Sequence, residues 1–327
     1  MFLSRHLVRE LSRHSATPIP ALRPLSTVSS LLNSRHKSPS LGDITPESVS
    51  SYKANLAAYR QKLKAASAAA AAEAAQAASA AGTVKSLLYG SPAAQKEEIE
   101  MEQSYGKVLA RGKYVHEIVL HKVKPERVAE YVEMIGEEYP KIAEDKDNNV
   151  HLVGSWKVEI GEADTFVHIW EYNGYAGYHQ TLNRLSTQKS YQKYATTLPN
   201  LITSRTHDLM QEFSFWPTSP PRSLGGIFEL RTYTLHPGNL LEWEQHWRRG
   251  LEARKNVMEG VGAWFTQVGS LNTVHHLWQF GDLRERQLAR EASWSKKGWS
   301  ETVHKTVPLI GKMQSRILVP LPWSPVR

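Results

Sequence analysis

The feature that most constrains the fold of this chain is an internal repeat. The segment FVHIWEY, residues 166–172, recurs 108 positions later as VHHLWQF, residues 274–280. Trp156 has its counterpart in Trp264 at the same separation, and the other repeated residues keep nearly the same spacing. The chain is therefore expected to contain two units of the same fold.

The pattern of each unit predicts a strand, a helix, a hairpin of two strands, a second helix and a final strand. In the first unit, Val128, Tyr131 and Ile135 have the spacing of one helical face. In the second unit, Asp282 is followed three residues later by Glu285, which predicts a capping box at the start of the second helix. The order β-α-β-β-α-β is that of the ferredoxin-like α+β fold.

A ferredoxin-like unit covers one face of its sheet with helices and leaves the other face bare. Two tandem units can bury both bare faces by packing sheet to sheet, which predicts a dimeric α/β-barrel built as a pseudo-dimer within one chain. In the first strand of the second unit, Phe228 and Leu230 share one face, and Glu229, Arg231 and Tyr233 share the other. We expect the apolar face to meet the helices and the polar face to point into the barrel.

The chain divides into four predicted parts. These are a leader at residues 1–42, an alanine-rich helical or disordered linker at 43–112, the first repeat at 113–217 and the second repeat at 225–327. The linker is rich in the strongest helix former but has few large apolar residues to bury. We expect it to act as a spacer; a short partner-binding helix is the alternative.

The leader has the features of a mitochondrial transit peptide. Arg5, Arg9 and Arg13 are spaced four apart among apolar residues, and a serine-rich, acid-poor segment follows them. Transit peptides are amphipathic, rich in arginine and serine, and poor in acidic residues. The leader predicts import into mitochondria, with the matrix as the expected compartment. A basic arm that binds an acidic partner is the alternative.

Composition excludes several classes of site and partner. The chain has no cysteine, which excludes disulfides, thiolate-bound metals and a cysteine nucleophile. The net charge is +8, but the leader supplies much of the basic excess. Because no folded segment carries a dense basic stripe, no nucleic-acid partner is expected. No apolar run reaches the roughly 18 residues of a membrane span, so no transmembrane segment is expected.

Four short segments of the second repeat make the chain similar to a known family. ELRTYTLHPG at 229–238, VHHLWQF at 274–280, TVPLI at 306–310 and SRI at 315–317 resemble the NIPSNAP domain. The first repeat resembles a more divergent copy of the same domain. The resemblance implies a mitochondrial protein of the dimeric α/β-barrel superfamily, with a role in mitochondrial quality control as a tag for autophagy adaptors. It implies no agreed catalytic residues.

The repeated histidines are the best candidates for chemistry. If their strand faces line the barrel interior, two histidines and two tryptophans would meet beside the polar face of the second repeat's first strand. Such a pocket could bind a quinone-like or haem-like ring, and relatives in the superfamily include cofactor-free monooxygenases. The competing interpretation is a hydrogen-bonded histidine in a packed core, which is the commoner arrangement. The candidate pocket consists of His168, Trp170, His276, Trp278, Glu229, Arg231 and Tyr233.

No other group of residues forms a catalytic motif. The chain has no glycine-rich phosphate loop, no Gly-x-Ser-x-Gly segment and no convincing helix with two histidines at metal-ligand spacing. Asp145 and Asp147 lack the glycine and the closing glutamate of a calcium loop, so they predict a solvated turn.

We therefore expect a mitochondrial binding or scaffold protein with no catalytic residues, no metal and no cofactor. The alternative is a barrel that binds a haem- or quinone-like ligand, with a cofactor-free monooxygenase as its enzymatic form. Expected partners are proteins of the matrix or the inner-membrane surface, autophagy adaptors and further copies of the chain. Five aromatic-x-x-aliphatic patterns fit adaptor docking as an added strand, although such patterns also arise by chance. They begin at Tyr139, Phe166, Phe265, Phe280 and Trp323.

Overall fold

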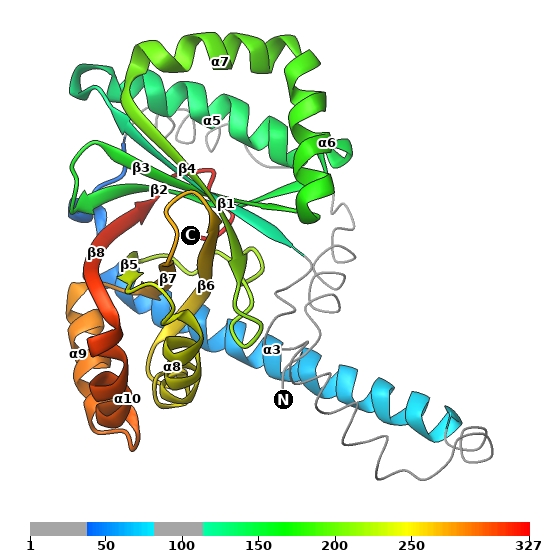
Figure 1. Ribbon diagram of the computed structural model, residues 1–327, viewed down its shortest axis with the longest axis vertical. Coiled ribbons are helices and arrows are strands. Elements are labelled where there is room, and N and C mark those ends of the chain that lie inside the picture. The colour runs from blue at the N-terminus through cyan, green and yellow to red at the C-terminus, as the bar shows by residue number, and fades with distance from the viewer. Residues whose placement is uncertain (1–37, 82–113) are drawn as a thin grey trace. The chain divides into compact units, whose positions relative to one another are not determined.

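The computed structural model of the chain describes residues 38–81 and 114–327 (Figure 1). These residues fall into two compact units: residues 54–81 belong to one, and residues 38–53 together with 114–327 belong to the other. The predicted transit peptide lies almost entirely outside the described residues, and so does much of the predicted linker.

The first repeat has the predicted order of elements, with its second helix divided in two. Its elements are β1 (Val115–Val123), α5 (Val128–Glu144), β2 (Val150–Ile160), β3 (Thr165–Tyr172), α6 (Gly174–Thr187), α7 (Lys189–Leu201) and β4 (Ile202–Glu212). A short 3-10 helix, η3 (Pro125–Arg127), leads into α5. Its proline occupies a first-turn position, where the missing N–H removes no helical hydrogen bond. Gln188 has extended backbone angles and ends α6.

The second repeat follows the same order. Its elements are β5 (Ile227–Leu235), α8 (Leu240–Arg254), β6 (Glu259–Val268), β7 (Thr273–Phe280), α9 (Leu283–Trp294), α10 (Trp299–Thr306), the 3-10 turn η5 (Val307–Leu309) and β8 (Ile310–Pro320). Asp282 caps α9, because its Oδ1 accepts from the backbone N–H of Glu285 at 2.7 Å. The Glu285 side chain in turn accepts from the N–H of Gly281 at 3.1 Å. The Asp282 half of the predicted capping box is therefore present, whereas the Glu285 side chain binds the N–H of the residue before the N-cap instead of that of Asp282.

The eight strands close into one barrel, which confirms the predicted architecture. Their order is β1-β3-β2-β8-β5-β7-β6-β4, so each repeat contributes four neighbouring strands. Antiparallel pairing of β2 with β8 and of β4 with β6 joins the two sheets. Helices α5 and α7 lie against the outside of the first sheet, and α8, α9 and α10 lie outside the second (Figure 1).

The barrel interior holds a packed, largely apolar core, which also contains the buried His116–Glu171 pair close to Trp264. One buried cluster takes residues from all eight strands and from none of the helices. Its largest members are Trp156, Trp264 and Phe228, which are fully buried, and the rings of Trp156 and Phe228 lie 5.6 Å apart. Sheet-to-sheet packing of this kind holds the two repeats together.

This core corrects the predicted orientation of the first strand of the second repeat. Phe228 and Leu230 belong to the barrel interior. Tyr233 belongs instead to the buried cluster that β5 and its neighbours form with α8. Since successive side chains of a strand alternate between faces, Glu229 and Arg231 also point toward the helices. The polar face therefore lies outside the barrel and beneath the helices.

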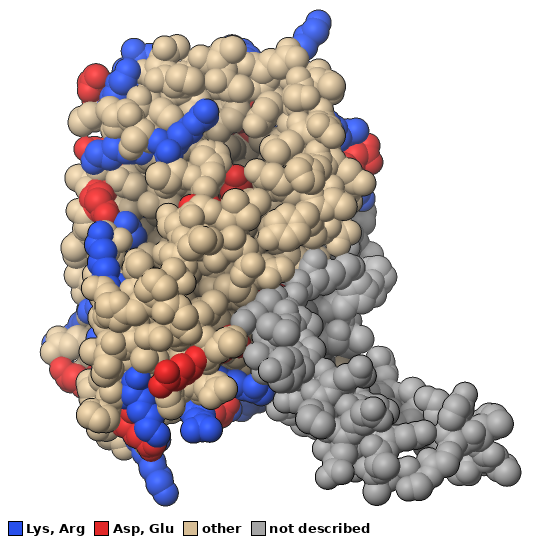
Figure 2. Space-filling model, in the orientation of Figure 1, with Lys and Arg blue, Asp and Glu red and all other residues tan. Residues whose placement is uncertain are grey.

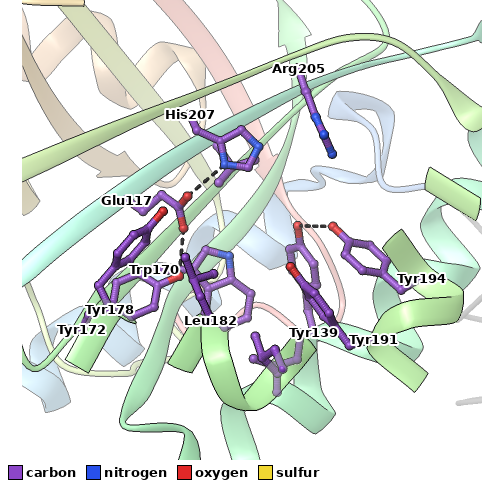
Figure 3. Close-up of a pocket in the computed structure, with 13 residues that line it drawn as sticks. Glu117, Tyr139, Trp170, Tyr172, Tyr178, Leu182, Tyr191, Tyr194, Arg205 and His207 are labelled. Atoms are coloured by element: carbon purple, nitrogen blue, oxygen red, sulfur yellow. Dashed lines mark hydrogen bonds and ion pairs between the residues drawn. The ribbon is translucent and has the colours of Figure 1, made fainter. Parts of the chain in front are cut away.

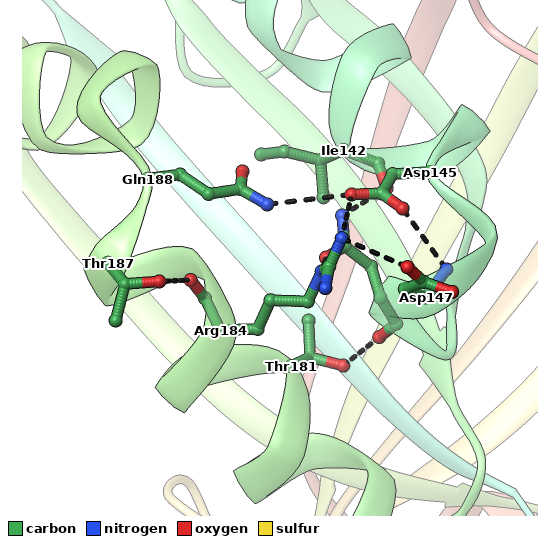
Figure 4. Close-up of polar contacts among 8 residues, drawn as sticks. Ile142, Asp145, Asp147, Thr181, Arg184, Thr187 and Gln188 are labelled. Carbon is green, nitrogen blue, oxygen red and sulfur yellow. Dashed lines mark hydrogen bonds and ion pairs between the residues drawn. The ribbon is translucent and has the colours of Figure 1, made fainter.

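The turn after α5 is an anchored structure and not only a solvated one (Figure 4). Nη2 of Arg184 on α6 lies 3.0 Å from Oδ2 of Asp145 and 3.3 Å from Oδ2 of Asp147. Asn148 is buried, and its amide donates to the carbonyl of Ile142 at 2.9 Å. These contacts join the turn to α6 and so fix the end of α5 against the neighbouring helix.

The segment before the first repeat also contacts the barrel unit, which differs from the expectation of a spacer. Helix α3 (Pro46–Ala81) begins inside this unit, and Tyr52 on its second turn is only 3% exposed. The Tyr52 hydroxyl donates to the carbonyl of Gln279 at 3.1 Å. Nζ of Lys53 lies 2.8 Å from Oε1 of Glu285. Residues 38–53 therefore pack on the second repeat. None of the helices in residues 38–81 and 114–327 combines the length and apolar character needed to cross a bilayer.

Candidate functional site

The structure separates the seven predicted pocket residues into two groups on the outer faces of opposite sheets. Trp170 belongs to the sheet–helix core of the first repeat, and His168 on the same strand face contacts Tyr139 of α5. The other five lie together on the second repeat, where Glu229 faces Trp278 and Arg231 faces His276 in the strand register. The two pairs of histidine and tryptophan therefore do not meet around a common axis.

His168 is held in a buried chain of hydrogen bonds. Its Nε2 lies 2.8 Å from the hydroxyl of Tyr131, and its Nδ1 lies 2.9 Å from the hydroxyl of Ser155. The Tyr131 hydroxyl also lies 2.8 Å from Nδ1 of His121. His168 is fully buried, and burial lowers its pKa well below the usual value. It is therefore a neutral core histidine with both nitrogens in use.

A cavity of about 320 Å³ lies next to this chain, between the first sheet and helices α5, α6 and α7 (Figure 3). Two of its walls are formed by aromatic pairs: the rings of Tyr139 and Trp170 lie 4.9 Å apart, and those of Tyr172 and Tyr178 also lie 4.9 Å apart. Its aromatic residues are Tyr139, Trp170, Tyr172, Tyr178, Tyr191 and Tyr194, and its charged or titratable residues are Glu117, Arg205 and His207.

Glu117 organises the polar side of the cavity. One carboxylate oxygen lies 2.8 Å from Nδ1 of His207, and the other accepts from the hydroxyl of Tyr172 at 2.8 Å (Figure 3). Glu117 is buried, whereas the side chain of His207 is 46% exposed. A carboxylate at Nδ1 favours the tautomer that carries its proton there, which leaves Nε2 of His207 as a hydrogen-bond acceptor. His207 therefore stands at the mouth of the cavity with a defined orientation.

The phenols of the cavity are hydrogen-bond donors at neutral pH. Burial raises the pKa of Tyr139 and Tyr194, and burial together with the charge of Glu117 raises the pKa of Tyr172. The hydroxyls of Tyr139 and Tyr194 lie 3.3 Å apart. The cavity thus presents apolar ring surface together with protonated hydroxyls, an arrangement suited to a ring with polar substituents.

The group on the second repeat forms a network around Glu229. One of its oxygens accepts from Arg231 at 2.8 Å, from Arg286 at 2.7 Å and from Ser315 at 2.7 Å. Burial alone would raise the pKa of Glu229, but the hydrogen bond from Arg286 and the charge of Arg231 outweigh it and bring the pKa to about 2. Nearby, Nδ1 of His276 accepts from the indole N–H of Trp278 at 2.9 Å.

The predicted histidines do not fit a bound haem. An axial ligand must direct a free nitrogen toward the iron in an open cavity. His168 has both nitrogens in hydrogen bonds, His276 is fully buried, and neither borders the cavity. In residues 38–81 and 114–327, no group of three or more His, Asp or Glu side chains is arranged to hold a metal ion.

Of the seven residues that the sequence predicts for a pocket, only Trp170 lines the cavity. One signal in the sequence is the pairing of Glu117 with Glu229 between the repeats, since both are acids at the same position of the first strand. A second signal is the helical spacing of Tyr191 and Tyr194. Neither signal indicates that α6 and α7 stand off the sheet far enough to leave a cavity.

Comparison with known proteins gives the following matches. A profile of the NIPSNAP family matches residues 116–217 and 228–325, one match in each repeat. Protein NipSnap homolog 2 of Homo sapiens is 42% identical over 214 residues, which cover 65% of this chain and 75% of that protein. Protein NipSnap homolog 1 of Danio rerio is 41% identical over 214 residues, which cover 65% of this chain and 77% of that protein. A solved structure of a candidate monooxygenase from Fusobacterium nucleatum superposes with a TM-score of 0.51 and 13% identity. The match covers 64% of this chain and 93% of that one, and at this identity it shows a likeness of fold alone.

The buried histidines predict that the folded chain loses stability in mild acid. Burial lowers the pKa of His121 and of His275 to about 3, so neither takes up a proton when pH falls below the unfolded value of 6.5, whereas the unfolded chain does. The part of the free energy of unfolding that these neutral histidines contribute is therefore present above pH 6.5 and is lost as the pH falls toward 3. Between pH 7 and 5.5 each such histidine should cost about 1 kcal/mol in the free energy of unfolding.

Urea denaturation at the two pH values measures this loss. His121→Gln should reduce the difference in the free energy of unfolding between pH 7 and pH 5.5 by about 1 kcal/mol, because it removes one titrating group. The matched control is His304→Gln, since His304 is exposed on α10 and should leave the difference unchanged. A free energy of unfolding that is the same at both pH values would contradict the prediction.

Proposed function

The chain belongs to the NIPSNAP family, and we propose that it acts in mitochondria as a binding protein whose first repeat holds a small aromatic molecule. The observation that carries the proposal is the cavity of about 320 Å³ between the first sheet and its helices. Small-molecule sites are typically about 300–1,000 Å³ and combine apolar walls with a few oriented polar groups. This cavity has both properties, at the small end of that range.

The lining defines the chemical class of the ligand. Aromatic rings prefer offset or edge-to-face contact with other rings, and the six aromatic side chains of the cavity can supply such contacts. The phenol donors suit a carbonyl oxygen, and the Glu117–His207 pair suits a hydroxyl. We therefore propose a compact phenol or quinone as the ligand class. The alternative of a ring between the two sheets has no room, because that space is filled by Trp156, Trp264 and their neighbours.

The Glu117–His207 pair favours a second candidate function, proton transfer. Nε2 of His207 faces away from the carboxylate that holds Nδ1 at 2.8 Å. A histidine oriented by a carboxylate is a common general base, and a phenol bound in the cavity would bring its O–H within reach of the mouth. In this function His207 accepts the phenol proton and Glu117 stabilises the resulting imidazolium.

The proposed compartment rests on the leader and on the family. Import would place the chain in the matrix, and we propose matrix or inner-membrane-surface proteins, or further copies of the chain, as its protein partners. On the face viewed in Figure 2, basic and acidic residues are interspersed without a continuous basic stripe, which gives no support to a nucleic-acid partner.

A role as a tag for autophagy adaptors is part of the same proposal, but the five short patterns give it little support. Docking as an added strand needs both anchor side chains to be free. Each pattern has at least one anchor that is 5% exposed or less, so binding would require local unfolding. These buried anchors are Ile142, Ile169, Phe265, Phe280 and Val326.

Calorimetric titration of the full chain with 1-naphthol and 1,4-naphthoquinone tests the binding function. We expect saturable binding of one molecule per chain. Leu182→Trp should weaken binding by at least about tenfold, because Leu182 lines the cavity and is 37% exposed, so a larger side chain can fill the mouth without disturbing the core. Leu288→Trp on α9 is the matched control, since Leu288 is 51% exposed on the other repeat.

In a parallel titration followed by absorbance, the spectrum of bound 1-naphthol reports its ionisation and hence tests the proton-transfer function. Binding should lower the apparent pKa of naphthol in the wild-type chain, and His207→Gln should abolish that shift. Absence of saturable binding, or equal binding by Leu182→Trp, would remove the proposed ligand site. Binding without a shift in the naphthol pKa would remove only the second candidate function.

Mitochondrial import is tested with a fluorescent fusion of the full chain. Replacement of Arg5, Arg9 and Arg13 by Glu reverses the charge of the leader, on which import depends, so the fusion should remain in the cytosol. The control replaces Lys62, Lys64 and Arg60 of α3 by Glu and should leave the mitochondrial signal unchanged. Mitochondrial signal from the leader variant would contradict the localisation.

A further inference from the structure

The second repeat has arginines at the positions where the first repeat forms its cavity. Glu229 takes the place of Glu117 at the head of the group. By the 108-residue offset of the sequence repeat, Arg286 corresponds to Tyr178 and Arg290 to Leu182. The same outer face of the sheet thus carries guanidinium groups beside its aromatic core.

The arginines outnumber the acids that face them. Arg231 and Arg286 share a single oxygen of Glu229, which also accepts from Ser315. The second oxygen of Glu229 is buried without a hydrogen-bond partner, and so is Nε of Arg286. Arg290 lies one helical turn after Arg286 on α9, and the guanidinium of Arg254 lies 5.8 Å from the ring of Trp278, which faces Glu229 in the strand register. The cluster therefore holds four guanidinium groups near one carboxylate.

Two of the four arginines have no acidic partner. In the described part of the chain, neither Arg254 nor Arg290 forms an ion pair or a hydrogen bond through its side chain. Arg254 is only 5% exposed, and its guanidinium lies 3.6 Å from the centre of the Trp299 ring and 5.8 Å from that of Trp278. Nε of Arg254 and one terminal nitrogen of Arg290 are buried without a partner.

The crowding of like charges is costly in the absence of an anion. Burial and then the charge of Arg290 bring the pKa of Arg254 down to about 9. Burial and then the charge of Arg231 lower the pKa of Arg290. An unpaired buried charge destabilises a protein unless a partner neutralises it, so a bound anion would relieve both the repulsion and the unused donors.

We propose that the cluster of Arg231, Arg254, Arg286 and Arg290 is a binding site for a phosphate group. Four guanidinium groups less one carboxylate leave a charge of +3, which a dianionic phosphate offsets better than a single carboxylate does. The planar fork of arginine matches the oxygens of phosphate, and stacking on Trp299 fixes the guanidinium plane of Arg254. Arg286 and Arg290 are only partly buried, so the group is open to solvent on the α9 side.

This site is separate from the pocket of the first repeat. The cavity there has one arginine, Arg205, and its polar centre is an acid paired with a histidine. The two repeats therefore offer different chemistry at equivalent places: aromatic binding on the first and phosphate binding on the second. A molecule that carries only phosphate should bind without involving the first site.

Titration of the full chain with inorganic phosphate at constant ionic strength tests the proposal. Calorimetry should show saturable binding of one phosphate per chain, and phosphate should raise the melting temperature where sodium chloride does not. Arg290→Gln should weaken phosphate binding by at least about tenfold, because it removes one charge-assisted contact. Arg290 is partly exposed, so this variant should fold, which its melting temperature in phosphate-free buffer will verify.

Two controls make the outcome specific. Arg284→Gln removes an exposed arginine from the same helix and should leave the phosphate affinity unchanged. Leu182→Trp, which fills the first-repeat cavity, should also leave it unchanged, so failure of that site does not affect this test. Absence of saturable phosphate binding, equal loss in Arg284→Gln and Arg290→Gln, or tighter binding of succinate than of phosphate would each overturn the proposal.

Discussion

Apolar packing between the two sheets is the contact on which the rest of this structure depends. Each ferredoxin-like repeat has an inner sheet face that its own helices leave bare, and the two inner faces bury one another around Trp156, Trp264 and Phe228. The β2–β8 and β4–β6 ladders close the barrel, so no sheet edge separates the repeats there. Because strand side chains alternate, apolar residues inside require that Glu117 and Glu229 lie outside, beneath the helices.

The outer faces are therefore the places where the two repeats differ. The same strand position carries a buried glutamate in both, and its partners set the chemistry: His207 and Tyr172 on one repeat, Arg231 and Arg286 on the other. A duplicated scaffold can hold two sites in this way, because the shared core does not depend on which polar residues cover its outside. The site on the first repeat is concave and aromatic, whereas that on the second is cationic.

Much of the fold follows from the sequence, but the location of the site does not. The repeat of FVHIWEY as VHHLWQF predicts two similar units, and the alternation of helical and strand periodicity predicts their order of elements. The interior face of β5 could not be assigned in this way, since large apolar side chains occur on both of its faces: Phe228 on one and Tyr233 on the other. The sequence does not predict the cavity, because the cavity depends on how far α6 and α7 stand from the sheet, which no local pattern encodes. Nor does the sequence predict the contact of Tyr52 with Gln279, because it joins residues 227 positions apart.

If one core holds both repeats, they must unfold together. Native-state hydrogen exchange of the full chain measures this directly at the backbone amides of β1 and β5, the central strands of the two sheets. We expect the same free energy of opening for both strands, equal to that of global unfolding, because neither sheet can keep its inner face buried without the other. Exchange of one strand through an opening that is less costly by about 2 kcal/mol or more would contradict it and would show that the repeats are stable independently.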